Sequence, residues 1–202
     1  MGDVRDQVDV KELLGGGLRR FGKLVHHIRD DQWGDETPCT DWDVRALVNH
    51  VVYENLWTVP MMEGATIEEV GDRYEGDVLG DDPVGNARAA ADAATMAAAS
   101  GIVAGRTVHL SFGDTPAEEY AYQLAADHII HGWDLAVATG GDRTIDPDLV
   151  EALAAWFADR EELYRSSGAT GPPPADPATA PDPQSRLLLA FGRDPGWSPD
   201  TT

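Results

Sequence analysis

The sequence has a single cysteine, lacks long apolar runs and begins without a targeting signal. The 202 residues include only Cys39 as a cysteine, which excludes an intrachain disulfide. No window approaches the roughly 18 consecutive apolar residues that a membrane-spanning helix needs, because polar side chains interrupt the alanine-rich run at 89–104. The first residues lack the basic and apolar regions of a signal peptide. These absences predict a cytoplasmic protein with no membrane partner.

Basic residues are also scarce. Fifteen Lys and Arg stand against 36 Asp and Glu, so the formal net charge is −21 at pH 7. A field of that sign repels polyanions, which excludes nucleic acid and anionic membrane surfaces as natural partners. Hydrophobic residues make up 42% of the chain and charged residues 25%, which is typical of a folded globular protein. The length predicts one domain that covers residues 1–202.

Helical periodicity dominates the chain, and we predict an all-α fold. Apolar residues at steps of three and four, such as Leu14, Leu18 and Phe21, form the stripe of an amphipathic helix. The predicted helices cover about 8–29, 41–62, 83–100, 116–139, 147–165 and 185–191. Between them we expect a loop with one short helical turn at 65–82, a short strand at 106–112, and an extended segment with six prolines at 168–183.

Two local features refine the helix boundaries. Residues 40–43 resemble a capping box at the start of the second helix. Gly15, Gly16 and Gly17 lie inside the first helix, where each glycine costs about 1 kcal/mol relative to alanine. Either another backbone passes close to these glycines, or the helix begins after them.

A polar cluster interrupts the apolar face of the helix predicted at 116–139. At 100° per residue, Asp127, His128 and His131 lie within about 60° of Leu124, which should face the core. Burying these groups without partners would cost several kcal/mol, so a metal ion or a hydrogen-bond network is needed. The helix at 41–62 offers His50 and, one turn later, Glu54.

These residue types suit a metal site. Asp127 and His131, at positions i and i+4, can chelate one ion, and His50 can supply a third ligand. A fourth position would then stay open to water or substrate, as in catalytic zinc sites. Two structural alternatives remain open from spacing alone: His50 bound to a backbone carbonyl, and an ordinary ion pair between Asp127 and His131.

Three blocks of sequence carry a resemblance to a known family. Residues 37–50 (TPCTDWDVRALVNH), 127–140 (DHIIHGWDLAVATG) and 191–197 (FGRDPGW) resemble the DinB-like metalloprotein superfamily, in the branch related to mycothiol-dependent maleylpyruvate isomerase. The resemblance implies a four-helix bundle, with short additional helices and at most one minor strand or hairpin. It also implies a divalent metal ion held by His50, Asp127 and His131.

The chain departs from the isomerase in two ways. The isomerase carries glutamate where this sequence has Asp127, and the neighbouring His128 offers a substitute imidazole. We also expect the chain to be too short for the additional C-terminal domain of the isomerase, so a shared substrate is not implied. Among the other residues, we expect Cys39 and Trp42 to serve packing, and Asp134 to bind a backbone group or an arginine such as Arg45.

The favoured function is a metal-dependent enzyme that uses a low-molecular-weight thiol, as a mycothiol-type S-transferase or isomerase. The expected ion is zinc, with nickel, manganese and iron as alternatives, and the expected partners are the thiol and an electrophilic substrate. Glu54 and His128 are the nearest candidates for proton transfer or for support of the ligands. A homodimer is compatible with the sequence. The rival hypotheses are a non-catalytic metal-binding or stress-linked protein, and a bundle whose polar stripe holds no metal.

Overall fold

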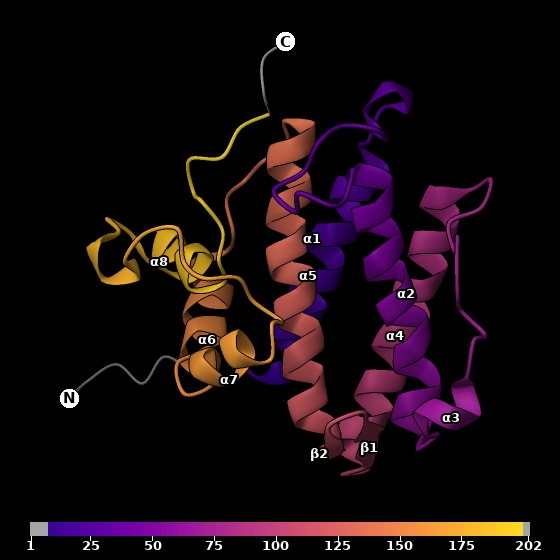
Figure 1. The fold of residues 1–202 in the computed structure, drawn as a ribbon. Helices are drawn as coiled ribbons and strands as arrows, with labels where there is room; N and C mark the ends of the chain where they lie inside the picture. Colours follow the sequence, from indigo (N-terminus) through magenta and orange to yellow (C-terminus); the bar gives the residue numbers. More distant parts are fainter. Residues whose placement is uncertain (1–7, 200–202) are drawn as a thin grey trace.

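Four long helices pack side by side and form the body of the protein (Figure 1). The computed structural model describes residues 8–199. The expectation that the first residues form no signal peptide falls on positions 1–7, which lie outside the described residues. The bundle consists of α1 (Val10–His26), α2 (Val44–Glu63), α4 (Pro83–Val103) and α5 (Ala117–Thr139). The predicted mostly helical bundle is confirmed. Within the described part of the chain, no helix combines the length and apolarity needed to cross a membrane.

Shorter elements decorate the bundle. The β1–β2 hairpin is antiparallel, pairs Val108 with Thr115, and lies at one end of the bundle, while α6, α7 and α8 lie together on one side of α5 (Figure 1). The bounds are η1 (Asp30–Gln32), α3 (Ile67–Val70), β1 (Thr107–Leu110), β2 (Gly113–Pro116), α6 (Pro147–Phe157), α7 (Glu161–Ser166), η2 (Pro177–Thr179) and α8 (Pro183–Ala190). The short strand expected at 106–112 is therefore the first half of a hairpin.

The start of α2 differs from the sequence-based expectation. The helix begins at Val44, and its N-cap is Asp43, whose carboxylate accepts a hydrogen bond from the amide of Ala46. Residues 37–42 form a loop because the Thr37 hydroxyl bonds to the Trp42 carbonyl and accepts from the Cys39 amide. The capping box predicted at 40–43 was thus wrong, since these loop bonds take the place of a first helical turn.

The single helix predicted at 147–165 is divided into α6 and α7. The break is at Arg160, whose amide bonds to the Phe157 carbonyl instead of the Trp156 carbonyl that a continuous helix would use. The Trp156 carbonyl accepts from the Arg160 guanidinium, which also binds the carboxylate of Glu119 on α5. The helix therefore ends because of an ion pair between residues that are distant in the sequence. The local spacing of apolar residues does not indicate this pair.

The glycines of α1 mark a close approach between helices. Because α1 begins at Val10, the glycines lie inside the helix and the alternative of a later start is wrong. A Cβ atom added at Gly17 would lie 3.0 Å from the Cβ of His128 and 3.2 Å from Cγ1 of Ile129, both on α5. Glycine at this position lets α1 pack directly against the helix that carries the polar cluster.

Replacing Gly17 with valine is expected to lower the free energy of unfolding by about 1–3 kcal/mol, the usual cost of overpacking. Gly22→Ala is the matched control in the same helix, because a Cβ atom added at Gly22 would meet nothing within 4 Å. The control should stabilise the protein by about 0.5–1 kcal/mol through helix propensity. Denaturant unfolding of both variants tests the contact, and equal stability of the two would contradict it.

Candidate metal centre

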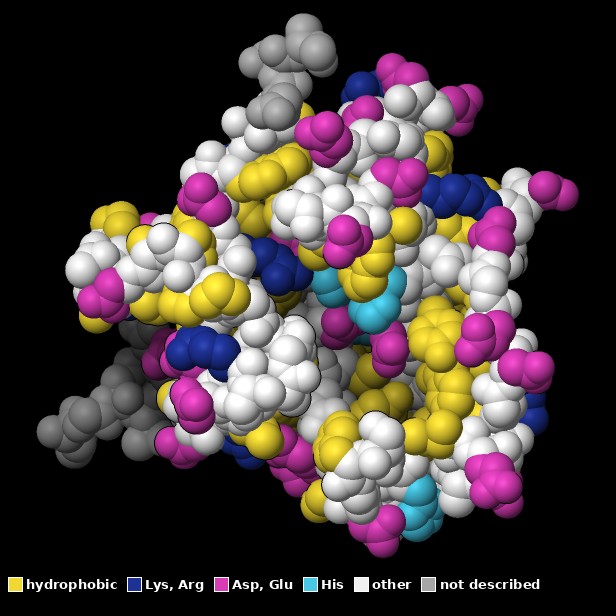
Figure 2. All heavy atoms as spheres, viewed as in Figure 1, with side chains coloured by type: hydrophobic (Ala, Val, Ile, Leu, Met, Phe, Trp, Pro, Cys, Tyr) yellow, Lys and Arg dark blue, Asp and Glu magenta, His cyan; other side chains and the backbone are white. Residues whose placement is uncertain are grey.

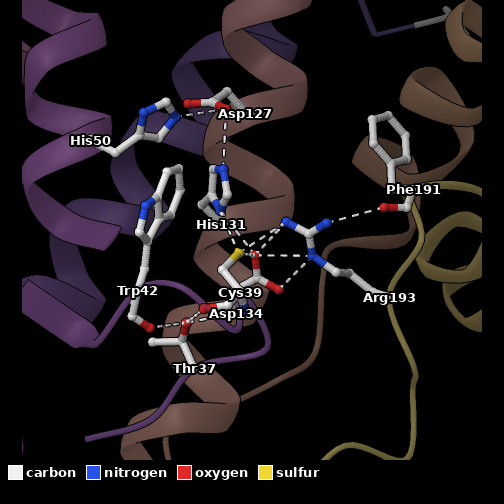
Figure 3. Close-up of polar contacts among 9 residues, drawn as sticks. All are labelled: Thr37, Cys39, Trp42, His50, Asp127, His131, Asp134, Phe191 and Arg193. Atoms are coloured by element: carbon white, nitrogen blue, oxygen red, sulfur yellow. Dashed lines mark hydrogen bonds and ion pairs between the residues drawn. The ribbon is translucent and has the colours of Figure 1, made fainter. Parts of the chain in front are cut away.

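α2 and α5 bring three ligand-type side chains together. The Nε2 atom of His50 lies 3.4 Å from Oδ1 of Asp127, and the Nε2 atom of His131 lies 3.3 Å from the same oxygen. One possible donor atom from each of the three side chains lies within 4.8 Å of the others. The close-up shows Asp127 beside both imidazoles, with His50 reaching across from α2 (Figure 3). The residues singled out by spacing and by resemblance thus meet at one point.

Asp127 is the anionic centre of this cluster. Burial alone would raise the pKa of its carboxyl, but the charge and hydrogen bond of His131, joined by those of His50, outweigh burial and hold the pKa well below its usual value. Its second oxygen, Oδ2, is buried and has no hydrogen-bond partner among the described residues. An unpartnered carboxylate oxygen beside two imidazole nitrogens fits a divalent cation, which binds such donors in proteins.

His131 is held in the orientation that a ligand needs. Its Nδ1 atom lies 2.9 Å from Oδ2 of Asp134, so it donates to that carboxylate and leaves Nε2 directed at Asp127. Burial alone would lower the pKa of His131, but the charge of Asp127 and the bonds to Asp127 and Asp134 raise it well above the usual value. A carboxylate behind a histidine in this way fixes the tautomer and ring orientation of metal ligands.

Asp134 binds an arginine, one of the two kinds of partner expected from the sequence, but this arginine is Arg193 and not Arg45. The guanidinium of Arg193 donates to both oxygens of Asp134, at 3.0 and 2.9 Å, and Asp134 is fully buried. Arg45 instead binds Asp77 at 2.8 Å. Arg193 comes from the segment after α8, so the C-terminal part of the chain closes over the bundle at this point (Figure 3).

A second group of ligand-type side chains lies at the Nδ1 edge of the His131 ring, away from Nε2. It consists of Cys39, His131 and Asp134, again with donor atoms within 4.8 Å of one another. The guanidinium of Arg193 already fills this group, since it also donates to Sγ of Cys39 at 3.3 Å. A fixed cation at this place disfavours a second positive ion. The cluster of His50, Asp127 and His131 therefore remains as the candidate metal centre.

Trp42 also belongs to the site. Its ring centroid lies 4.7 Å from that of His50 and 5.7 Å from that of His131, so the indole packs against both imidazoles. The Thr37 bonds described above hold the loop that carries Trp42 and Cys39 (Figure 3). Both residues do pack, as expected: Trp42 packs against the apolar core and also against the polar cluster, and Cys39 packs against Asp134 and Arg193. Sequence reasoning missed this role, although both lie in the block that carries the resemblance.

Glu54 and His128 are the two candidates for proton transfer or for support of the ligands. Of the two, Glu54 faces the cluster. Burial, joined by the charge of Asp127, raises the pKa of Glu54 to about 7, and the charges of His50 and His131 oppose the shift. His128 points toward α1, where its ring packs edge-on against Phe21. Its Nδ1 atom donates to the Leu124 carbonyl at 2.7 Å. His128 is thus a core histidine, and it does not join the three ligand-type residues.

The candidate centre borders an open pocket. A hollow of about 340 Å³ is lined by Trp42, Tyr53, Glu75 and neighbouring residues, and His50 belongs both to its wall and to the cluster. Figure 2 shows histidine side chains at the edge of a hollow that also exposes acidic and hydrophobic side chains. A larger hollow of about 500 Å³ lies near α6, remote from the cluster, and its Arg160 and Glu119 satisfy each other.

Comparison with known proteins decides the family. Residues 14–136, more than half of the chain, match the family model described as the mycothiol maleylpyruvate isomerase N-terminal domain. The chain belongs to this family. The matched region contains α2 and nearly all of α5, and therefore His50, Asp127 and His131. Arg193 lies beyond it.

Two relatives are similar to this chain in sequence, and one solved structure is similar to it in fold. The chain is 34% identical over 177 residues to Uncharacterized protein Rv0738 and to Uncharacterized protein MT0763, each from a strain of Mycobacterium tuberculosis. Each alignment covers 86% of this chain and 91% of the relative. The crystal structure of the mycothiol-dependent maleylpyruvate isomerase matches with a TM-score of 0.50 and 21% identity, over 81% of this chain and 72% of that one. This structural likeness shows that the family members share the fold.

Proposed function

We propose that this member of the mycothiol maleylpyruvate isomerase N-terminal domain family is a metal-dependent enzyme. It would use a low-molecular-weight thiol of the mycothiol type in an S-transfer or isomerisation reaction with an electrophilic substrate. One observation carries the proposal: three ligand-type side chains converge beside an open pocket, and His50 is shared between the two. A centre with three protein ligands and one accessible side is the arrangement of catalytic metal sites, whereas structural sites are closed.

The proposed ligands are Nε2 of His50, a carboxylate oxygen of Asp127 and Nε2 of His131. Two imidazoles and one carboxylate suit zinc, and they also suit nickel, manganese or iron. When bound, a divalent ion lowers the pKa of a thiol so that the thiolate forms near neutral pH. The His131 proton must leave before the ligand nitrogen is free, so metal affinity is expected to rise with pH.

The remaining residues orient reactants and move protons in this proposal. Asp134 and Trp42 fix the His131 ring from two sides, so its Nε2 atom stays directed at Asp127. Glu54 is the proposed proton acceptor for the thiol, because a carboxyl group with a pKa of about 7 can accept and return a proton at neutral pH. The bond between Arg193 and Asp134 ties the C-terminal segment to the bundle, and we propose that residues 1–202 act as one domain within the cytoplasm.

Titration calorimetry with 2-mercaptoethanol tests the proposed function. The zinc-loaded protein is expected to bind the thiol and release a proton, whereas protein stripped by a chelator should bind at least about tenfold more weakly, a difference of about 1.4 kcal/mol. Asp127→Ala is the matched variant and should behave like the stripped protein. Equal thiol binding with and without metal would contradict the enzyme proposal. Metal binding without any thiol binding would support the non-catalytic alternative.

A further inference from the structure

The pocket beside His50 has a defined chemical character. One stripe of the α2 region supplies Trp42, Ala46, Asn49, His50 and Tyr53, which lie at helical spacing along one wall. The opposite wall comes from the loop after α3, through Glu75 and Gly76. Two aromatic rings and one carboxylate thus face the same space next to the candidate metal centre.

Of the amide and carboxylate groups in this wall, only the Glu75 carboxylate is free to meet a ligand. Asn49 is already occupied, because its amide nitrogen donates to the Gly76 carbonyl and its oxygen accepts from the Val78 amide. Glu75 has no hydrogen bond or ion pair to another side chain among the residues described. The pocket therefore presents one unneutralised carboxylate at its mouth.

No Lys or Arg belongs to the described lining of this pocket. Two arginines discussed above already have other partners. Arg193 binds Asp134, and Arg45 binds Asp77 and the Gly80 carbonyl. A carboxylate-bearing substrate would find no guanidinium with which to form the bidentate pair that usually recognises this group.

The electrostatic effects on the pocket residues agree with a lining that has a carboxylate and no Lys or Arg. Burial raises the pKa of the Tyr53 hydroxyl, and the charges of Glu54 and Glu75 raise it further. The charged groups that act on Glu54 itself are Asp127, His50 and His131, with no lysine or arginine among them. Even with a divalent ion in place, Asp127, Glu54 and Glu75 carry enough negative charge to offset it.

We propose that this pocket selects a reactant with a positively charged group, such as an ammonium, next to its reactive atom. This inference rests on the proposed function and names the substrate class of the same site. Trp42 and Tyr53 offer ring faces to which an ammonium is attracted, and Glu75 offers the counter-charge. A dicarboxylate such as maleylpyruvate, which appears in the name of the structural neighbour, is disfavoured here.

Three thiols that differ only in one group test the inference. They share the skeleton HS–CH₂–CH₂–X, where X is trimethylammonium, hydroxyl or sulfonate, and none of these groups is a strong chelator. Calorimetry on the zinc-loaded protein at low ionic strength is expected to rank them in that order, with the cationic thiol at least about tenfold tighter than the anionic one. Low salt is needed because the charges are near the surface.

Glu75→Gln separates the effect of the pocket from the different acidities of the three thiols. The variant should reduce the ratio of cationic to anionic affinity by about threefold or more. Glu151→Gln, on the exposed face of α6, is the matched control and should leave the ratio unchanged. An unchanged ratio in Glu75→Gln, or an anionic thiol that binds as tightly as the cationic one, overturns the inference. If none of the three thiols binds, the proposed function itself is wrong and the inference is overturned with it.

Discussion

Replacing His50, Asp127 or His131 with alanine is expected to remove most of the bound metal. Each change deletes one of three donors whose atoms lie within 4.8 Å of one another, and two donors cannot complete the site. Metal stoichiometry of purified, folded variants gives the measurement. Zinc at 100 times its Kd should raise the melting temperature of the wild type by about 5–10 °C, and this shift should disappear in each variant.

Two controls make this prediction specific. His128→Ala is expected to keep the metal, because the His128 ring faces α1 and its Nδ1 is bound to the Leu124 carbonyl. Asp127→Glu keeps a carboxylate and should retain the ion with a changed metal preference. If His128→Ala empties the site while Asp127→Ala leaves it full, the histidine is the true ligand. If no variant changes the stoichiometry, the metal proposal fails.

Arg193→Met is expected to lower the free energy of unfolding by about 3–5 kcal/mol, the cost of removing one partner of a buried ion pair. The carboxylate of Asp134 is fully buried and receives three hydrogen bonds from Arg193, so the substitution would leave an uncompensated charge. Arg186→Met is the matched control, because Arg186 is exposed and should change stability by no more than about 0.5 kcal/mol. Urea unfolding compares the two variants.

A second variant separates the stability role of the pair from its action on His131. Asp134→Asn removes the charge behind the His131 ring and is expected to weaken metal binding by about 10–100-fold. Combining Asp134→Asn with Arg193→Met should cost less stability than Arg193→Met alone, because the buried unpaired carboxylate is then absent. Unaltered metal affinity in Asp134→Asn would show that the pair serves only the fold.

The long helices could be predicted from sequence because their signals are local. Apolar spacing sets each buried face, and Gly64 and Gly140 end α2 and α5 in left-handed conformations with positive φ, as glycine after a helix predicts. The start of α2 failed because local loop bonds of Thr37 displaced the predicted first turn, and the break before α7 failed because it depends on a distant partner. The break before α7 follows from the pairing of Arg160 with Glu119, which are 41 residues apart.

The residues of the candidate centre could also be predicted from the sequence. Asp127 and His131 lie one turn apart on α5, so helical geometry alone puts them on one face. Their placement beside His50 depends on how α2 packs against α5; spacing offered His50 as a third ligand, and the sequence resemblance implied the same residue. Spacing also put His128 on the core-facing stripe, and His128 is buried there, but its ring packs against α1, because about 60° around α5 from His131 is enough to direct a side chain to the other neighbouring helix.

The sequence by itself determined the helical class of the protein and the residue types available for a metal centre. Only the tertiary structure decided that Arg193 fills the second group at Cys39 and Asp134, and that Trp42 packs on the imidazoles. Arg193 and Asp134 are 59 residues apart, and Arg193 lies in the irregular segment after α8. No periodicity in the sequence relates such positions, because their contact depends on how the loops pack against the folded helix bundle.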